Sequence, residues 1–224
     1  EDPIPAATQE SKDSAQRIAE ILGEVETLLG ELEPELGRLD AIAGDGDHGQ
    51  GMVLGSRAAR AAAQRTVDGG CGARTVLVQA GAAWSAEAGG TSGALWGAAL
   101  TSIGSAFQDD RAVSDDQLFT GLVQAVEAVE RLGGAKPGDK TMVDAAVPFR
   151  EAIALAQATG SEETRAQVIA TAAARATESA EATANISASM GRARNHGDKS
   201  VGTPDPGAIS FSRIATRLAE LLDA

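Results

Sequence analysis

Apolar side chains near the start of the chain recur with alternating spacings of three and four residues. The series comprises Ala15, Ile18, Leu22, Val25, Leu29 and Leu32. An α-helix turns once in about 3.6 residues, so this spacing gathers the side chains on one face and predicts an amphipathic helix. Pro34 is expected to end or kink that helix, because the residue before a proline avoids helical geometry.

Helical patterns also cover most of the remaining chain. An alanine-rich helix is predicted to run to about residue 65, a second over about 75–87, and a segment of small residues follows over about 89–107. Two further apolar stripes consist of Phe119, Leu122, Val126 and Val129, and of Phe211, Ile214, Leu218 and Leu221. Between them, a long helix rich in Ala, Ser and Thr is expected over about 162–190.

Local signals mark where several of these helices begin and end. Ser114 and Gln117 form a capping box, Gly133 with Gly134 stops the helix behind it, and Thr141 with Asp144 begins the next one. No segment has a convincing strand pattern and no repeat is present. The sequence therefore predicts an all-α fold of roughly seven to nine helices.

Composition narrows the choice of partners. Hydrophobic residues make up 43% of the 224 residues but aromatic residues only 3%, so the apolar mass is aliphatic and favours close helix packing. The net charge of −13 argues against nucleic acid or anionic membranes as partners. The single Cys71 excludes an internal disulfide and suits a reducing, cytoplasmic location. No apolar run approaches the roughly 20 residues of a membrane-spanning helix, and no signal peptide is recognisable.

The segment 40–51 carries the strongest chemical signal. Three carboxylates, Asp40, Asp45 and Asp47, fall within eight residues and lie among four glycines. Carboxylates this close repel one another unless a cation holds them, and such hard oxygen ligands suit Mg²⁺ or Ca²⁺. The glycines let a ligand approach main-chain N–H groups closely. The segment therefore indicates a metal–phosphate site, and the alternative is a solvated Asp/Gly turn.

Two better-known motifs do not account for the sequence of segment 40–51. Residues 44–49 formally read G-x-G-x-x-G, but the dinucleotide fingerprint follows a buried strand, and the residues before it are polar and interrupted by Pro34. An EF-hand counted from Asp45 would need glycine where Gln50 stands and glutamate where Ser56 stands. Neither motif is present.

Three later segments offer groups that suit an anion. The segment Gly89-Gly90-Thr91-Ser92-Gly93 precedes a helix. Its main-chain N–H groups and two hydroxyls suit a phosphate at the start of that helix, and the alternative is an ordinary N-cap. The turn that starts at Lys136 is a surface loop when taken alone. Arg192 follows Gly191 before a second glycine- and proline-rich loop that ends at Gly207, and an arginine fork suits phosphate. A helix end decorated with cations is the alternative.

Single side chains also carry candidate roles. His48 is interpreted as a phosphate or water contact, because its loop is otherwise glycine and aspartate, whereas His196 is expected to be solvated. Trp84 and Trp96 lie on helical stretches and are expected in the core. With only two histidines, the chain cannot assemble a convincing Ser/His/Asp or Cys/His set.

Four separated segments in this order resemble the nucleotide-binding (L-type) domain of the dihydroxyacetone kinase family. They are Gly44-Asp-Gly-Asp-His-Gly with Asp40 before it, Gly89-Gly-Thr-Ser-Gly, Lys136-Pro-Gly-Asp-Lys-Thr-Met, and Gly191-Arg-Ala with Asp205-Pro-Gly-Ala. The resemblance covers the chain from about residue 14 to its end. It implies a barrel of about eight antiparallel helices with the nucleotide at one end.

The resemblance also implies roles for particular residues. Asp40, Asp45 and Asp47 would hold two Mg²⁺ ions that bridge the phosphates of ATP or ADP, and Arg192 would stabilise charge that develops during transfer. The implied nucleotide contacts are His48, Gly49, Gln50, Gly51, Thr91, Ser92, Gly133, Met142, Arg192, Asp205, Pro206 and Gly207.

The function implied by the resemblance is half of a kinase. ATP would phosphorylate a short ketose, dihydroxyacetone or a tetrulose such as erythrulose, held by a separate ketose-binding (K-type) domain that nothing in this chain resembles. One alternative is a subunit whose tightly bound ADP is recharged by a phosphotransferase-system protein. Another is a non-catalytic nucleotide-sensing module that binds a regulator.

The first ten residues bear on how this half is joined to its partner. Residues 1–10 contain two prolines and acidic residues without a periodic apolar face, which is typical of a linker or tail. We therefore expect residues 11–224 to form the nucleotide-binding domain, and hypothesise that the chain is the C-terminal part of a two-domain kinase. An independent subunit with a processed terminus is the alternative.

Overall fold

The computed structural model describes residues 7–190, 194 and 197–223. The long helices are α1 (Gln9–Asp40), α2 (His48–Asp68), α3 (Ala73–Ala88), α4 (Gly90–Ala106), α5 (Asp115–Gly133), α6 (Met142–Thr159), α7 (Arg165–Ala182) and α9 (Pro206–Asp223). A 3₁₀ turn (Thr183–Asn185) and the short α8 (Gly197–Ser200) lie between α7 and α9. The described part of the chain contains no strand, so the prediction of an all-α fold is confirmed.

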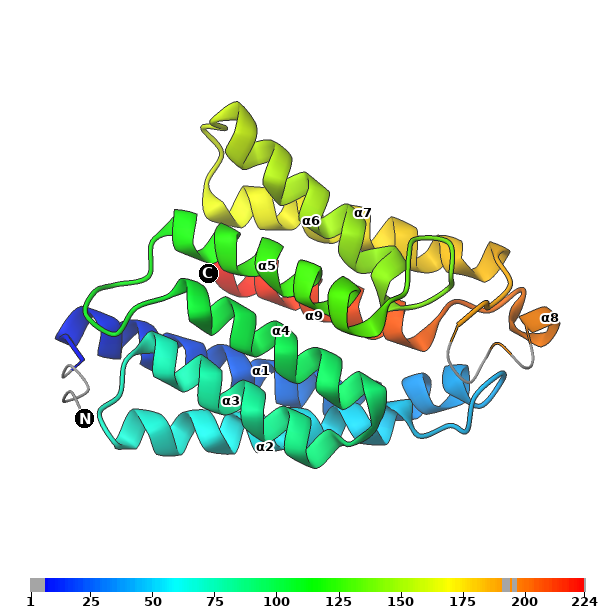
Figure 1. Cartoon of the computed structure of the whole chain (residues 1–224), viewed down its shortest axis with the longest axis horizontal. Helices are drawn as coiled ribbons and strands as arrows, with labels where there is room; N and C mark the ends of the chain where they lie inside the picture. The colour runs from blue at the N-terminus through cyan, green and yellow to red at the C-terminus, as the bar shows by residue number, and fades with distance from the viewer. Residues whose placement is uncertain (1–6, 191–193, 195–196, 224) are drawn as a thin grey trace.

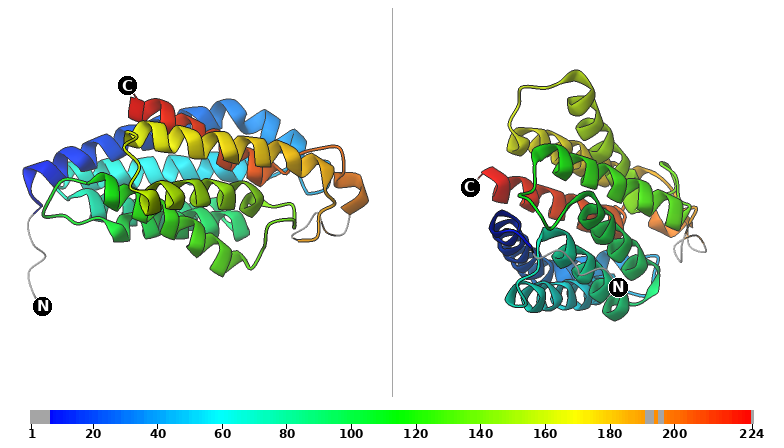
Figure 2. Two further views of the ribbon diagram at one scale, coloured as in Figure 1. Left: turned by 90° about the horizontal axis from the view of Figure 1, so that it is seen from above. Right: turned by 60° about the vertical axis from the view of Figure 1, so that its left-hand side comes forward.

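The eight long helices form a closed antiparallel barrel. Each packs against the next in sequence, and α9 packs against both α7 and α1, which closes the ring. The helices follow the long axis of the molecule, with the start of α1 and the end of α9 at the end opposite α8 (Figures 1 and 2). Because the chain runs up and down, the α1–α2, α3–α4, α5–α6 and α7–α9 connections all meet at the α8 end.

The barrel interior is filled by side chains. Leu29, Leu36, Met52, Ile153 and Ile169 are fully buried. Trp84, Trp96, Phe211 and Phe149 form a row of aromatic contacts, with successive ring centroids 5.5, 6.0 and 5.5 Å apart. Both tryptophans are therefore core residues, as predicted.

Helices α3 and α4 approach each other more closely than ordinary side chains allow. A Cβ atom built on Gly97 would lie 2.7 Å from the carbonyl oxygen of Gly81, and one on Gly81 would lie 2.7 Å from that of Gly97. Small residues at this crossing set the separation of the two helices. The crossing fixes the turn that joins them, at residues 89–90.

The predicted helix signals and the observed caps agree at three places. Ser114 with Gln117 and Thr141 with Asp144 both form complete capping boxes. Gly134 ends α5 in the left-handed conformation. Local side-chain chemistry therefore fixed these ends without help from distant contacts.

Two helices extend differently from the predictions, and Pro34, expected to end or kink the first helix, does not end it. Helix α1 continues through Pro34 to Asp40. The carbonyl that loses its amide partner there belongs to Gly30, which is exposed and can be solvated. The helix expected over about 162–190 ends at Ala182, where the buried Thr183 donates to the carbonyl of Ala180 and accepts from the amide of Asp205. None of the described helices is long and apolar enough to cross a membrane.

Candidate functional site

The α8 end of the barrel holds a cavity of about 840 Å³. It is lined by residues from all four connections at that end, including Asp40, Asp45, Asp47, Thr91, Ser92, Thr141, Met142, Thr203 and Asp205. Segments that lie far apart in the sequence therefore meet in one pocket. Its volume is within the range of roughly 300–1,000 Å³ that is usual for small-molecule sites.

Three carboxylates converge at one side of the cavity. Asp40 ends α1, and Asp45 and Asp47 lie in the turn before α2. One oxygen atom from each of the three lies within 4.8 Å of the others. Asp45 and Asp47 are exposed and Asp40 is partly buried. An all-carboxylate donor set with this spacing fits a hard, oxygen-seeking cation such as Mg²⁺.

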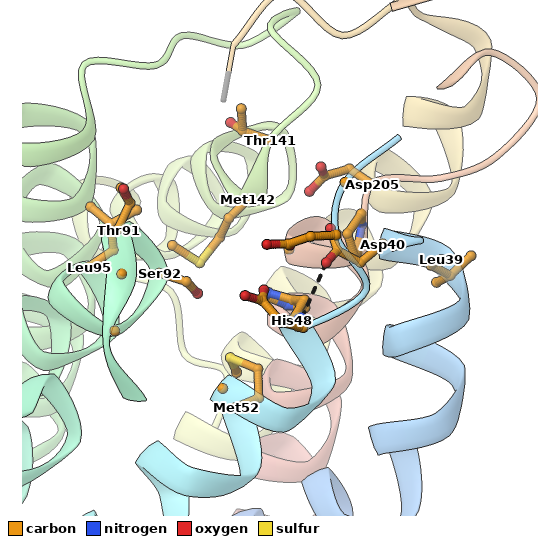
Figure 3. Close-up of a pocket in the computed structure, with 18 of the residues that line it drawn as sticks. Leu39, Asp40, His48, Met52, Thr91, Ser92, Leu95, Thr141, Met142 and Asp205 are labelled. Atoms are coloured by element: carbon orange, nitrogen blue, oxygen red, sulfur yellow. Dashed lines mark hydrogen bonds between the residues drawn. The ribbon is translucent and has the colours of Figure 1, made fainter. Parts of the chain in front are cut away.

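The first turn of α2 is held in place from two sides. The amide of His48 donates to Oδ2 of Asp40 at 3.2 Å, which is the contact drawn in Figure 3. The imidazole Nε2 lies 3.0 Å from Oγ of Ser210 on α9. Burial lowers the pKa of the His48 imidazole, although the charge of Asp40 opposes this effect. His48 therefore ties the start of α2 to both α1 and α9.

Gly49 does not line the cavity but allows α2 to reach it. A Cβ atom at this position would lie 2.3 Å from the carbonyl oxygen of Glu33 in α1. Only glycine fits so close to another backbone. Gly49, which was predicted to contact the nucleotide, packs against α1 and so brings His48, Gln50 and Gly51 to the cavity wall.

The opposite wall comes from α4 and α6. Thr91 and Ser92 occupy the first turn of α4, facing Asp40 and His48 across the cavity, and Met142 reaches between the two sides (Figure 3). Hydroxyls and main-chain N–H groups at a helix start suit phosphate oxygens. The polarizable thioether of a methionine suits an aromatic base.

Asp205 lines the cavity on the side of α9 (Figure 3). It immediately precedes α9, and its Oδ2 accepts the amide of Ala208 at 2.7 Å. Burial raises the pKa of the Asp205 carboxyl to about 7, and the nearby charge of Asp144 adds to this, whereas the Ala208 amide and the Lys140 ammonium oppose it. A large fraction of Asp205 is therefore neutral near pH 7.

This raised pKa makes a prediction about stability. Between the ordinary value of 3.8 and about 7, the folded state binds a proton that the unfolded state has lost. Stability is therefore expected to fall as pH rises through this window, by up to roughly 4 kcal/mol. Asp205→Asn keeps the cap but cannot ionise. The nucleotide-free variant should melt at a higher temperature than wild type near pH 8, and the gap should close near pH 4.

Thermal unfolding followed by circular dichroism across this pH range measures the difference. The matched control is Asp116→Asn, which changes an exposed carboxylate in the first turn of α5. If the melting temperatures of Asp205→Asn and wild type differ by the same amount at every pH, the pKa of Asp205 is not raised by folding, and the prediction is wrong.

Most residues singled out from the sequence line this cavity. They are Asp40, Asp45, Asp47, His48, Gln50, Gly51, Thr91, Ser92, Met142, Asp205, Pro206 and Gly207. Gly133 lies behind the wall, where a Cβ atom would be 3.3 Å from Cδ2 of the lining residue Leu95. Arg192 and His196 lie outside the described residues.

Several residues of the cavity wall were not among the predicted contacts, including Lys140, Thr141, Ile42 and Leu54. Lys140 and Thr141 lie within the third family motif, where Thr141 was predicted only as a helix start. Ile42 lies between two of the aspartates in sequence, which was a usable signal. Leu54 and Lys140 reach the cavity through the helix geometry and an unusual backbone conformation, which the sequence does not display.

A sequence model described as "DAK2 domain" matches residues 42–220. The chain belongs to the DAK2 domain family. This confirms the resemblance on which the implied fold and site were based.

Relatives of this DAK2 domain include larger kinases. The chain is 52% identical over 98% of its length to L-erythrulose 1-kinase of Mycolicibacterium smegmatis, and spans 38% of that protein. It is 42% identical over 99% of its length to L-erythrulose kinase of Pectobacterium atrosepticum, and spans 37% of it.

Two other matches show the domain in different contexts. The chain is 29% identical to the ADP-binding subunit DhaL of a PEP-dependent dihydroxyacetone kinase from Listeria innocua, with 82% of the chain and 83% of the subunit covered. It also matches the crystal structure of the dihydroxyacetone kinase from C. freundii in complex with AMP-PNP and Mg²⁺. That match has a TM-score of 0.65 and 29% identity, and covers 90% of this chain and 33% of the other.

Proposed function

We propose that this DAK2 domain is the ATP–Mg²⁺-binding half of a kinase that phosphorylates a short ketose, with erythrulose as the favoured substrate. The observation that carries the proposal is the convergence of Asp40, Asp45 and Asp47 on a cavity of nucleotide size. The 52% identity to an L-erythrulose 1-kinase supports the choice of substrate class.

The charge of the chain explains why a metal is needed. A net charge of −13 disfavours a bare polyphosphate, and no cationic side chain except Lys140 lines the described cavity wall. Bound Mg²⁺ ions, two in number by resemblance to the family, would neutralise the phosphate oxygens and the charge that develops on them during transfer. Asp40, Asp45 and Asp47 are the residues that would hold them.

The remaining lining residues position the nucleotide. The hydroxyls of Thr91 and Ser92 would donate to phosphate oxygens at the start of α4. Met142 would contact the base, with residues 205–207 on the same side of the cavity. Arg192, outside the described residues, is the proposed donor to the transferring phosphoryl group. Phosphoryl transfer requires little covalent chemistry from a protein beyond such positioning.

The ketose must reach the phosphates from another domain. The chain spans less than two fifths of the two erythrulose kinases, and the family resemblance assigns ketose binding to a K-type domain. That partner has to cover the cavity mouth, because the attacking hydroxyl must come within about 3–3.5 Å of the phosphorus. Ile42 and Leu54 line the mouth and are 43% and 41% exposed, which suits an apolar contact with the partner.

This contact makes a second prediction. Leu54→Gln should raise the half-saturating concentration of the K-type domain about three- to tenfold in a kinase assay, because an exposed apolar contact is lost. The affinity for Mg²⁺–ADP should not change. Leu155→Gln is the matched control, since Leu155 is 59% exposed on α6 and does not line the cavity. Equal behaviour of the two variants would show that the partner does not touch Leu54.

Reconstitution tests the proposed function itself. The chain, a K-type domain of an erythrulose kinase, erythrulose and Mg²⁺–ATP are mixed, and erythrulose phosphate is measured by mass spectrometry. We expect product only when both proteins and ATP are present. Absence of product with ATP, under conditions where nucleotide binds, would contradict the proposal and favour a nucleotide-sensing module.

One observation favours a second candidate. The Listeria innocua relative is described as the ADP-binding subunit of a PEP-dependent kinase, and the match covers 83% of that subunit. If this chain works in the same way, ADP should co-purify in stoichiometric amount and resist gel filtration. Rapid loss of ADP, with turnover supported by free ATP, identifies the ATP-dependent kinase.

A further inference from the structure

Lys140 is a buried lysine in an unusual backbone conformation. It has 5% of its surface exposed, and its φ angle is +61°, the one positive value among the described non-glycine residues. Left-handed backbone of this kind disfavours a residue with a side chain, so surrounding contacts must stabilise it. Nothing in the proposed function uses Lys140, although it lines the cavity beside Thr141.

The ammonium group of Lys140 donates hydrogen bonds to three main-chain carbonyl groups. Nζ donates to the oxygen of Ile186 at 3.0 Å, of Ser200 at 2.5 Å and of Thr203 at 2.7 Å. A lysine ammonium has three protons, and all three are used by these bonds. No proton remains for a phosphate oxygen, so the geometry separates Lys140 from lysines that bind phosphate directly.

The three carbonyls lie near the two ends of the segment 183–205, which joins α7 to α9. Ile186 is close to its start, and Ser200 and Thr203 are close to its end. Two further hydrogen bonds link the two ends of this segment. The amide of Gly202 donates to the oxygen of Ala184 at 2.8 Å, and the amide of Ala188 donates to Oγ of Ser200 at 3.1 Å.

Two sets of contacts join this loop to the α5–α6 connection. One is the Lys140 ammonium, and the other is Ser189, whose amide donates to the oxygen of Asp139 at 3.2 Å and whose hydroxyl donates to Oδ1 of Asp139 at 2.6 Å.

The position of this loop determines one wall of the cavity. Residues 203–207 line the cavity directly after the last carbonyl that Lys140 holds, and Thr141 and Met142 line it directly after Lys140 itself. The ammonium therefore helps to fix the distance between two walls whose bonded residues, Lys140 and Thr203, are 63 positions apart in the sequence. Burial lowers the pKa of Lys140, and the charge of Asp205 opposes this effect.

We propose that Lys140 is a positioning residue that holds residues 203–207 against Thr141 and Met142 and so shapes the nucleotide cavity. This inference rests on the proposed function for its ligand. An arginine cannot replace it, because a planar guanidinium cannot direct donors at three carbonyls that converge on one point.

Calorimetric titration of the full chain tests the proposal. Lys140→Met keeps the length of the side chain and the same backbone constraint but removes the three donors. We expect its affinity for Mg²⁺–ADP and for Mg²⁺–AMP-PNP to fall by the same factor, about tenfold or more. Lys140→Arg should fall similarly. Titration with Mn²⁺ alone should match wild type, because the three aspartates belong to α1 and the turn after it. Lys136→Met, an exposed lysine of the same loop, is the matched control.

Two results would overturn the proposal. One is unchanged nucleotide affinity in Lys140→Met. The other is a loss that is much larger for AMP-PNP than for ADP and is restored by arginine, since that pattern identifies a direct phosphate contact. Failure of the wild-type chain to bind any nucleotide would instead overturn the proposed function.

Hydrogen exchange tests the positioning role without a nucleotide. In Lys140→Met, the amides of Gly202 and Asp205 should exchange at least about tenfold faster than in wild type, with the amides of α1 and α2 unchanged. Lys140→Gly, which relieves the left-handed backbone, serves if the methionine variant folds poorly, and n-butylammonium should slow its exchange again. Exchange at Gly202 and Asp205 that matches wild type in both variants would contradict the positioning role.

Discussion

Asp45→Ala is expected to abolish Mg²⁺-dependent nucleotide binding while leaving the barrel folded. Asp45 is exposed in the turn between α1 and α2, so its removal costs little packing. Its carboxylate lies within 4.8 Å of those of Asp40 and Asp47, and without a cation these charges repel one another. The variant therefore loses a metal ligand and gains relief of that repulsion. We expect at least a hundredfold loss of affinity for Mg²⁺–ADP, equivalent to about 2.8 kcal/mol.

Calorimetry with Mg²⁺–ADP measures the loss, and circular dichroism measures helix content and melting temperature. Asp47→Ala should behave in the same way. Asp40→Ala is less informative, because Oδ2 of Asp40 also accepts the amide of His48 at the start of α2. Asp68→Ala, at the other end of α2, is the control and should bind as wild type. Normal binding of Mg²⁺–ADP by Asp45→Ala would exclude these carboxylates as the metal site.

Gly97→Val is expected to have the largest effect on stability. A Cβ atom there would lie 2.6 Å from Cβ of Ser85 and 2.7 Å from the carbonyl oxygen of Gly81, and neither backbone can move without separating α3 from α4. Overpacking against backbone on both sides should cost about 3 kcal/mol or more. Nucleotide affinity should fall too, because the first turn of α4 carries Thr91 and Ser92.

Chemical denaturation followed by circular dichroism gives the free energy of unfolding of this variant. Ser105→Val, on an exposed position of the same helix, supplies the cost of a β-branched residue in α4 without overpacking. The difference between the two variants isolates the crossing. If Gly97→Val is as stable as Ser105→Val, the close approach of α3 and α4 does not govern the barrel.

Much of the fold was predictable because local patterns decide it. The apolar stripe that begins at Ala15 specifies α1, and the capping boxes at Ser114 and Thr141 specify where α5 and α6 begin. The end of α7 was not predictable in this way. Alanine and threonine favour no particular stopping point there, and the helix stops because Thr183 accepts the amide of Asp205, which lies 22 residues later in the chain.

The site was predictable to the extent that topology could be inferred. Its four segments are separated along the chain by whole helices, and only an up-and-down barrel brings alternate connections to one end. The family resemblance supplied that barrel, and the packing of the helices confirms it. Lys140 escaped prediction because its importance lies in a left-handed backbone and three distant carbonyls, neither of which leaves a pattern in the sequence.

The central claim is that the three aspartates hold the cation that carries the nucleotide. Anomalous diffraction from crystals of this chain grown with Mn²⁺ and AMP-PNP tests it directly. We expect peaks at about 2.0–2.3 Å from carboxylate oxygens of Asp40, Asp45 and Asp47, with the phosphates of AMP-PNP on the far side of the metal, toward Thr91 and Ser92. Nucleotide bound in the cavity with the metal coordinated elsewhere, or with no metal near these carboxylates, would contradict the claim.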